Sequence, residues 1–307
     1  MDKFDDLITN GNSNNNRGIN RKDYEYASST TAEDIKHETY TEEEIQDVNA
    51  IQVTIPDPDI PIVIFFGSPA SGKTLALLRM IRYLEQHNHR VEAEPLFRPK
   101  TDRHYTRMCA ELKDMAYNQY TPGGNDVISF MLVKVLNDVG KPVCQILEAP
   151  GEHYFDGGVD SEFPRYIKDI CENSNRKVWV FFVEQGWGIN QNERDRYAQR
   201  ICDMQNLIST QDRIVFLFNK CDKHRRSQYL RDGKPNKKVY FTNIQNQYKG
   251  IFDNYTNSDI VTRFLYGKYN FKTICFSAGT FSRTNDGKEA WTVGKDFYCK
   301  ELWDAIH

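Results

Sequence analysis

Residues 61–75 read Pro-Ile-Val-Ile-Phe-Phe-Gly-Ser-Pro-Ala-Ser-Gly-Lys-Thr-Leu and join two different hydrophobic patterns. The run from 62 to 66 is apolar and rich in β-branched and aromatic side chains, which is typical of a buried strand. Beyond it, apolar side chains recur at three- and four-residue steps from Leu75 to Leu84, which is the spacing of an amphipathic helix. The chain therefore passes from a strand into a helix through residues 67–74.

The turn between them, Gly-Ser-Pro-Ala-Ser-Gly-Lys-Thr, fits the phosphate-loop pattern G-x-x-x-x-G-K-[ST]. Its glycines let the backbone N–H groups point at phosphate oxygens, and the helix adds its unpaired N-terminal donors. Lys73 supplies positive charge for the β- and γ-phosphates, and the Thr74 hydroxyl is a ligand for Mg²⁺. A chance Gly/Ser turn is the alternative, but the flanking strand and helix favour a nucleotide site. The expected nucleotide contacts are Gly67, Ser68, Pro69, Ala70, Ser71, Gly72, Lys73, Thr74 and Leu75.

Length and composition indicate an ordinary globular chain. With 307 residues it can form one large domain or two smaller ones, and its net charge of −3 by itself indicates neither a nucleic-acid nor a membrane partner. Residues 1–58 hold 13 acidic and 5 basic residues. We expect 1–58 to be an acidic, largely disordered extension, with one short helix near 41–46, on a domain that spans 59–307. Insertions into that domain are expected at about 90–125 and 223–270.

The seven cysteines are scattered singly, without C-x-x-C or a paired Cys/His spacing. This pattern indicates a reducing compartment and argues against a disulfide scaffold or a zinc site. The N-terminus lacks the apolar core of a signal peptide, and no apolar run approaches the length of a membrane span. We therefore predict a cytoplasmic protein with no membrane span.

Five further apolar runs predict strands at 126–136, 142–147, 178–183, 214–218 and 273–276. Helical patterns lie at about 106–118, 161–173, 190–208 and 295–306. The segment 137–141, Asn-Asp-Val-Gly-Lys, has the composition of a hairpin turn, so the two strands beside it should pair antiparallel.

Three of these strands end in polar motifs, where ligands bind in open α/β sheets. Glu148-Ala-Pro-Gly151 places an acidic residue to meet Mg²⁺ through water and a glycine N–H to meet the γ-phosphate. In Asn219-Lys220-x-Asp222, the carboxylate can accept from both the ring N–H and the amino group of guanine. Lys220 would cover the face of the base, and Asn219 would tie this loop to the phosphate loop. Ser277-Ala278 follows the last strand, where a backbone N–H can reach the guanine carbonyl oxygen.

The order of phosphate loop, E-x-x-G, N-K-x-D and S-A resembles that of a P-loop GTPase of the Ras-like, translation-factor-related (TRAFAC-type) class. The resemblance covers about residues 60–307. It implies an α/β fold, namely the three-layer P-loop NTPase fold of a Ras-like G domain. The implied sheet is six-stranded and mostly parallel, with strand order 2-3-1-4-5-6 and the second strand antiparallel. It also implies binding of GTP and GDP with Mg²⁺, GTP hydrolysis, a switch function, and a protein effector or regulator.

Two positions depart from the family pattern. Glu148 replaces the usual Asp and would hold a metal-bound water from a longer arm. Glu152 replaces the Gln or His that positions the attacking water, and a carboxylate there would be repelled by the γ-phosphate unless it were protonated or bridged by water. His153 is the alternative residue for this role, although a solvated loop histidine is the simpler interpretation. We expect the catalytic group to comprise Lys73, Gly151, Glu152 and His153.

The switch threonine that would complete the Mg²⁺ site with Thr74 and Glu148 has no unique match. Thr121 is our first choice, with Thr101 and Thr106 as alternatives. The interval from Lys73 to Glu148 is longer than a minimal GTPase needs, so the chain is more similar to larger bacterial-type members. The arginines in this interval, one of which could serve as an internal arginine finger, are Arg98, Arg103 and Arg107. Solvated charges are the simpler interpretation for each of them.

Residues 223–270 are basic, with Tyr and Phe interleaved. This composition is compatible with a nucleic-acid partner, but a surface insertion whose aromatic side chains pack on the body is favoured. Two alternatives to a GTPase switch remain open. One is a scaffold that holds GTP without hydrolysis, and the other is a P-loop ATPase or kinase in which N-K-x-D is accidental.

Overall fold

The computed structural model describes residues 40–119, 130–155, 162–186, 188, 190–224, 227–231, 233–284 and 289–307. Its main sheet is built from β1 (Ile62–Phe66), β2 (Arg90–Ala93), β3 (Met131–Leu136), β4 (Pro142–Glu148), β5 (Lys177–Glu184), β6 (Arg213–Asn219) and β9 (Lys272–Cys275). Two small hairpins lie outside that sheet. They consist of β7 (Leu230–Arg231) with β8 (Lys234–Pro235), and β10 (Gly279–Arg283) with β11 (Glu289–Val293).

The strands of the main sheet follow the order β2-β3-β4-β1-β5-β6-β9. Only β3 runs against the others, because it pairs antiparallel with both β2 and β4 while the remaining pairs are parallel. Without β2, the order is the predicted 2-3-1-4-5-6 of a Ras-like G domain, so the predicted fold is confirmed.

The prediction of six strands was wrong, because β2 adds a seventh at the edge of the sheet. This strand has four residues, and of these only Val91 is buried. A segment with one buried apolar side chain carries too little alternation for a strand to be recognised from sequence. Edge position explains that composition, since the outer side of β2 has no partner strand to pack beside.

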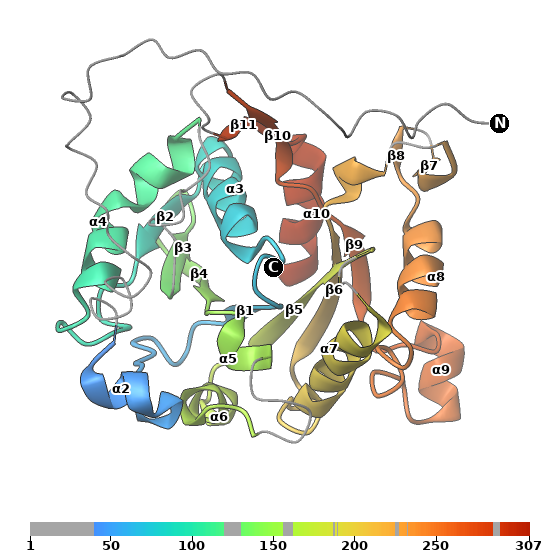
Figure 1. The fold of residues 1–307 in the computed structure, drawn as a ribbon, viewed down its shortest axis with the longest axis horizontal. Coiled ribbons are helices and arrows are strands. Elements are labelled where there is room, and N and C mark those ends of the chain that lie inside the picture. The colour runs from blue at the N-terminus through green and yellow to red at the C-terminus, as the bar shows by residue number, and fades with distance from the viewer. Residues whose placement is uncertain are drawn as a thin grey trace, which may run out of the picture.

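The helices are α2 (Glu42–Gln46), α3 (Lys73–Gln86), α4 (Arg103–Tyr117), α5 (Glu152–Phe155), α6 (Arg165–Glu172), α7 (Gln191–Met204), α8 (Lys237–Gln247), α9 (Ile260–Tyr266) and α10 (Asp296–Ile306). Figure 1 shows α3 and α10 on one side of the sheet and α5, α6 and α7 on the other. The three layers of the predicted fold are therefore present. Within the part of the chain that the structure describes, none of the helices has the length and apolarity needed to cross a bilayer.

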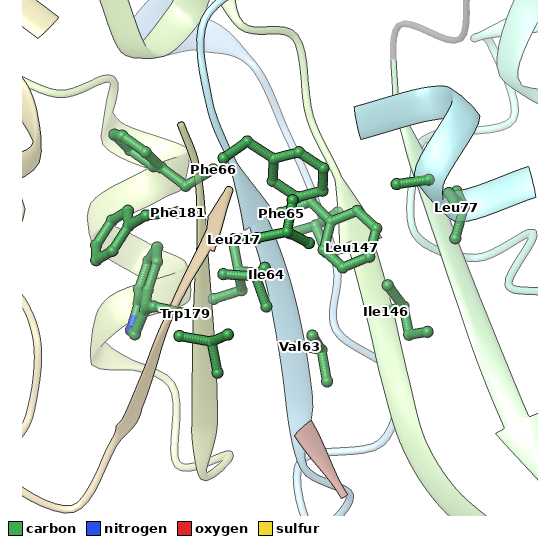
Figure 2. Close-up of a cluster of buried hydrophobic side chains, with 14 of the residues drawn as sticks. Val63, Ile64, Phe65, Phe66, Leu77, Ile146, Leu147, Trp179, Phe181 and Leu217 are labelled. Atoms are coloured by element: carbon green, nitrogen blue, oxygen red, sulfur yellow. The ribbon is translucent and has the colours of Figure 1, made fainter. Parts of the chain in front are cut away.

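The core lies on both faces of the central strands. All five residues of β1 are buried, and their side chains pack between those of β4, β5 and β6 and those of α3. Figure 2 shows Phe66 beside Phe181 on one face and Leu77 of α3 near Ile146 on the other. Burial of this many large apolar side chains fixes β1 and so fixes the loop that begins at its carboxyl end.

Aromatic side chains of the 223–270 section contribute to the same core. Tyr240, Tyr248, Phe252 and Tyr255 are each no more than 1% exposed. Phe252 packs edge-on to Phe216 of β6, with ring centroids 4.8 Å apart. These rings therefore stabilise the body of the protein.

Helix α9 is different, because its apolar side chains face outward. It ends in Gly267 and is capped at its start by Asp259, whose carboxylate accepts from the backbone N–H of Thr262. The exposed apolar residues of this helix, called the α9 surface below, are Ile260, Val261, Phe264, Leu265 and Tyr266, with exposures of 83%, 67%, 88%, 63% and 77%.

Candidate nucleotide-binding site

The predicted phosphate loop joins β1 to α3, and its two glycines are required by close contacts. A Cβ on Gly67 would lie 2.6 Å from Ser71 Oγ and 2.9 Å from Phe182 Cβ. Gly72 has a φ of +87°, and a Cβ there would lie 2.6 Å from Asn219 Nδ2. Glycine is therefore the residue that suits both positions, one for space and one for space and backbone conformation.

Lys73 starts α3 and is 5% exposed. Its ammonium group turns back into the loop, where it donates to the backbone oxygens of Gly67 at 2.9 Å and Ser68 at 3.1 Å. Burial lowers the pKa of Lys73, while the nearby carboxylates of Glu148 and Glu152 act to raise it. The positive charge thus lies inside the loop, where an anionic ligand would gain most from it.

Thr74 and Glu148 lie together beside this charge. The Thr74 hydroxyl donates to one carboxylate oxygen of Glu148, and the other oxygen, Oε2, is buried without a hydrogen-bond partner. Burial raises the pKa of Glu148 to about 7, against the opposing effects of Lys73 and of the Thr74 hydroxyl. A hydroxyl beside a carboxylate that is costly to bury alone fits Mg²⁺, which prefers oxygen ligands.

Among the described residues, no group of three or more His, Cys, Asp or Glu side chains is arranged to hold a metal ion. A magnesium ion at Thr74 and Glu148 would therefore depend on phosphate oxygens and water for its remaining ligands. This is the usual arrangement for Mg²⁺ at nucleotide sites, where one or two protein ligands are combined with the substrate.

The E-x-x-G loop contacts the phosphate loop directly. A Cβ on Gly151 would lie 2.3 Å from Pro69 N and 2.5 Å from the carbonyl carbon of Ser68, so a larger residue would push the two loops apart. Glu152 follows as the first residue of α5 and is exposed. Leu75, the last of the expected phosphate-loop contacts, is half-buried in the first turn of α3. The catalytic roles predicted for Gly151 and Glu152 stay predictions.

His153 is half-buried, and its ring lies against aromatic side chains. Its Nδ1 is 2.9 Å from the Tyr166 hydroxyl, and its ring centroid is 6.0 Å from that of Tyr40 and 5.7 Å from that of Phe130. Burial, together with the positive charge of Arg98, lowers the pKa of His153 to about 4. The imidazole is therefore neutral near pH 7 and engaged with this aromatic cluster, and its proposed role in positioning water stays a prediction.

The N-K-x-D loop follows β6 and is bonded to the phosphate loop by two side chains. Asn219 Nδ2 donates to Ser71 O at 2.6 Å, and Lys220 Nζ donates to Ala70 O at 3.0 Å. Lys220 and Ala70 both have positive φ, at 56° and 57°. The structure thus brings together two loops separated by about 150 positions, with both backbones held in a conformation that is uncommon for residues other than glycine.

The carboxylate expected to read the base is also fixed by a neighbour. Ser277 Oγ donates to Asp222 Oδ1 at 2.5 Å, so the S-A loop after β9 orients the N-K-x-D loop. Glu184, the last residue of β5, forms ion pairs of 2.6 Å with both Lys220 and Lys223. The sequence analysis missed Glu184, although a polar residue at the carboxyl end of a predicted strand was a usable signal.

The candidate switch threonines lie in different surroundings. Thr121 is outside the described residues. Thr106 lies in α4, and its hydroxyl donates to the backbone oxygen of Asp102 at 3.0 Å. Thr101 is exposed just before that helix. The threonine that would complete a Mg²⁺ site stays a prediction.

Arg98 is committed to a buried ion cluster. Its guanidinium donates to both carboxylate oxygens of Glu44, at 3.0 and 3.1 Å, and to Asp102 Oδ2 at 2.8 Å. The three side chains are 0%, 5% and 1% exposed respectively. In this conformation Arg98 holds α2 against the segment before α4 and is not directed at the phosphate loop.

No protein-family model matches the chain, and no curated protein sequence matches it. Several solved structures are similar at low scores. The putative nucleolar GTP-binding protein 1 of Plasmodium falciparum has a TM-score of 0.36 and 14% identity, with 74% of this chain and 80% of that chain covered. The SRb GTP complex of Chaetomium thermophilum, from the signal recognition particle receptor, has a TM-score of 0.40 and 9% identity, with 81% and 99% covered.

The Ski7 GTPase-like domain of S. cerevisiae, solved with GDP and inorganic phosphate, has a TM-score of 0.37 and 13% identity, with 81% of this chain and 50% of that chain covered. Since all three scores are low, the fold is assigned from the strand order, and the site from the contacts between its loops.

Proposed function

We propose that this chain binds GTP and GDP with Mg²⁺, hydrolyses GTP to GDP and phosphate, and acts as a nucleotide-dependent switch. The observation that carries the proposal is the bonded loop pair, in which Asn219 and Lys220 reach the phosphate loop while Ser277 holds Asp222. Such a unit would hold a carboxylate for a base at a fixed distance from a cradle for phosphates. Guanine can donate two hydrogen bonds to that carboxylate, and adenine cannot.

The chemistry proposed is phosphoryl transfer to water without a covalent intermediate. Lys73 would move from its contacts with Gly67 and Ser68 to the β- and γ-phosphates. The Gly151 N–H would orient the γ-phosphate, and Thr74 with Glu148 would hold the metal, Glu148 through water. A magnesium ion there would neutralise charge on the β- and γ-phosphate oxygens.

A GTP-binding scaffold without hydrolysis is the second candidate. Glu152 occupies the position where a water-positioning residue is expected, and His153 is engaged with the Tyr166 hydroxyl. If neither residue reaches the attacking water, hydrolysis would need a group supplied by a protein regulator. The existence of such a partner, like the cytoplasmic location, is proposed from the sequence.

The first experiment is a titration with fluorescent GDP, GTP and ATP analogues, with and without Mg²⁺, followed by measurement of phosphate release. We expect guanine-selective, Mg²⁺-dependent binding. Release of phosphate by the pure protein would favour the switch, whereas tight binding without release would favour the scaffold. Equal or better binding of the ATP analogue would contradict the guanine assignment and leave a P-loop ATPase or kinase.

The matched variant for the base is Asp222→Ala. It should lower the ratio of guanine to adenine nucleotide affinity by about 10- to 100-fold, because it deletes a charged hydrogen-bond acceptor. The contacts with the phosphates should remain. Asp304→Ala, at an exposed position in α10, serves as the control. Unchanged selectivity in Asp222→Ala would mean that another group reads the base.

A further inference from the structure

The β10–β11 hairpin begins directly after the S-A loop, and the sequence analysis did not foresee it. Gly279, the first residue of β10, pairs with Val293 near the end of β11, so the hairpin returns the chain to its own starting point. In Figure 1 both strands lie beside α3 and the start of α10. Nothing in the proposed nucleotide chemistry uses this hairpin, and yet it contacts the loop expected to meet guanine.

Trp291 of β11 makes the contact. Its indole Nε1–H donates to the backbone oxygen of Ala278 at 3.1 Å, and its backbone N–H donates to the backbone oxygen of Gln119 at 2.7 Å. The side chain is 4% exposed, and the Arg82 guanidinium lies over the ring at 4.5 Å. A buried indole N–H needs an acceptor, so Trp291 and Ala278 are fixed relative to each other.

The peptide on the other side of Ala278 is held by packing. A Cβ on Gly294 would lie 2.7 Å from Ser277 O, which belongs to that peptide. The Gly294 N–H donates to Ala278 O at 2.8 Å, so the oxygen bonded by Trp291 accepts a second hydrogen bond. A Cβ on Gly279 would lie 2.1 Å from Thr292 O. The hairpin therefore restrains both peptide planes that meet at Ala278, one by hydrogen bonds and one by close contact.

We propose that Trp291 is a positioning residue for guanine recognition. It fixes the backbone at Ala278 so that the Ala278 N–H points at the position of the guanine carbonyl oxygen O6. This inference rests on the proposed function, because it assigns a support to the same base site. Trp291 does not touch the nucleotide itself and acts through Ala278.

The test uses GDP and the 5′-diphosphate of 2-aminopurine riboside, which lacks O6 and also lacks the N1–H that would donate to Asp222. Because the ligands differ at both positions, the effect of a substitution is measured for each ligand against wild-type protein. Trp291→Phe keeps an aromatic ring but removes one of the two N–H donors to Ala278 O, and the shorter bond from the Gly294 N–H remains. We expect Trp291→Phe to lower the affinity for GDP by about 3- to 10-fold, which is the effect of one misplaced hydrogen bond. Binding of the 2-aminopurine diphosphate should be unchanged, since it makes no bond at O6.

The control is Trp303→Phe, which alters a similarly buried tryptophan of α10 that packs near His89 and His307. It should leave both affinities as they are in the wild type. Equal weakening of GDP and of the 2-aminopurine diphosphate by Trp291→Phe would overturn the inference and give Trp291 a structural role only. No weakening of either would overturn it as well.

If Trp291→Phe does not fold, Arg82→Met is the second variant. It removes the cation that stacks on the indole together with the Arg82 hydrogen bonds to the backbone oxygens of Ala116 and Asn118, so the comparison between the two ligands separates a local effect from a general one. A lower affinity of Arg82→Met for GDP, with unchanged affinity for the 2-aminopurine diphosphate, would support the inference. An unchanged affinity for GDP would overturn it. Failure of the proposed function has a separate signature, because wild-type protein would then bind GDP no better than ADP.

Discussion

Glycines 279 and 140 both have positive φ, at 140° and 80°, but their surroundings differ. A Cβ on Gly279 would lie 2.1 Å from Thr292 O, whereas one on Gly140 would have nothing within 4 Å. In Gly279→Ala the added methyl group clashes with the backbone oxygen of Thr292, and this clash adds to the strain of the positive φ. The substitution should therefore lower the free energy of unfolding by about 3 kcal/mol or more. Gly140→Ala should cost only about 1 kcal/mol.

Urea denaturation of the two variants checks this prediction, and the difference between their midpoints isolates the clash. Similar midpoints for Gly279→Ala and Gly140→Ala would mean that the hairpin can move away from the S-A loop. That result would also weaken the case for a fixed Ala278.

His153 makes a pH prediction at the same scale. Its folded-state pKa of about 4 lies below the ordinary value of 6.5, so the unfolded chain binds the proton more readily between these values. The stabilisation is present above about pH 6.5 and is lost as the pH falls towards about 4. His153→Phe should flatten the pH dependence of the melting temperature in this window. His89→Phe, at a half-exposed position, is the control.

The bond from Asn219 to the phosphate loop could be expected from the motif, because the motif specifies residues by their chemistry. The bond from Lys220 to Ala70 was not predicted, and the expected place of Lys220 over the base stays a prediction. The surroundings of His153 could not be expected either. Tyr40, Phe130 and Tyr166 are far apart in the sequence, so no local pattern indicates that they enclose the imidazole. Trp291 was missed for a similar reason, since its partner Ala278 lies across a hairpin from it.

Helix α2 supplies the prediction at the scale of the element. Of its five residues only Glu44 is buried, and Glu44 accepts hydrogen bonds from buried Arg98. Glu44→Ala leaves a buried guanidinium with one carboxylate partner fewer, so it should lower the free energy of unfolding by about 3 to 5 kcal/mol. Asp304→Ala breaks the exposed pair with Lys300 and should cost less than about 0.5 kcal/mol.

Chemical denaturation measures both values, and limited proteolysis reports on α2 alone. Faster cleavage near residues 40–52 in Glu44→Ala, with the rest of the chain still protected, would indicate that Arg98 fastens this element. Equal losses of stability in Glu44→Ala and Asp304→Ala would contradict the buried-pair argument.

The six long or strongly apolar strands could be expected from sequence, and the resemblance to P-loop GTPases supplied their order. The elements that were missed are those with little periodic signal. Strand β2 buries one apolar side chain. In β11, the second strand of the β10–β11 hairpin, Trp291 is the one buried residue. Such elements depend on tertiary contacts for their stability, and those contacts lie outside any local window of sequence.

At the scale of the whole molecule, the α9 surface gathers five of the large apolar side chains that are exposed among the described residues. Contiguous exposed apolar side chains bind hydrophobic probes. Phe264→Ser together with Leu265→Ser should reduce retention on a phenyl column and the fluorescence of a bound naphthalene sulfonate dye, with stability changed by less than about 0.5 kcal/mol. Val139→Ser, at an isolated position 79% exposed, should change neither signal. Unaltered retention of the double variant would mean that the α9 surface is not the site of binding.

The bonds from Asn219 to Ser71 and from Lys220 to Ala70 have a further consequence, because they join the base loop and the phosphate loop into one unit. Binding of the base or of the phosphates would then order both loops, so the second half would bind to loops that are already ordered. Guanosine and pyrophosphate, added as separate molecules, should raise each other's affinity, and by thermodynamic linkage the two factors must be equal. Asn219→Ala should bring both factors towards one. The mutual effect of guanosine and pyrophosphate therefore measures how strongly the protein couples recognition of the base to binding of the phosphates.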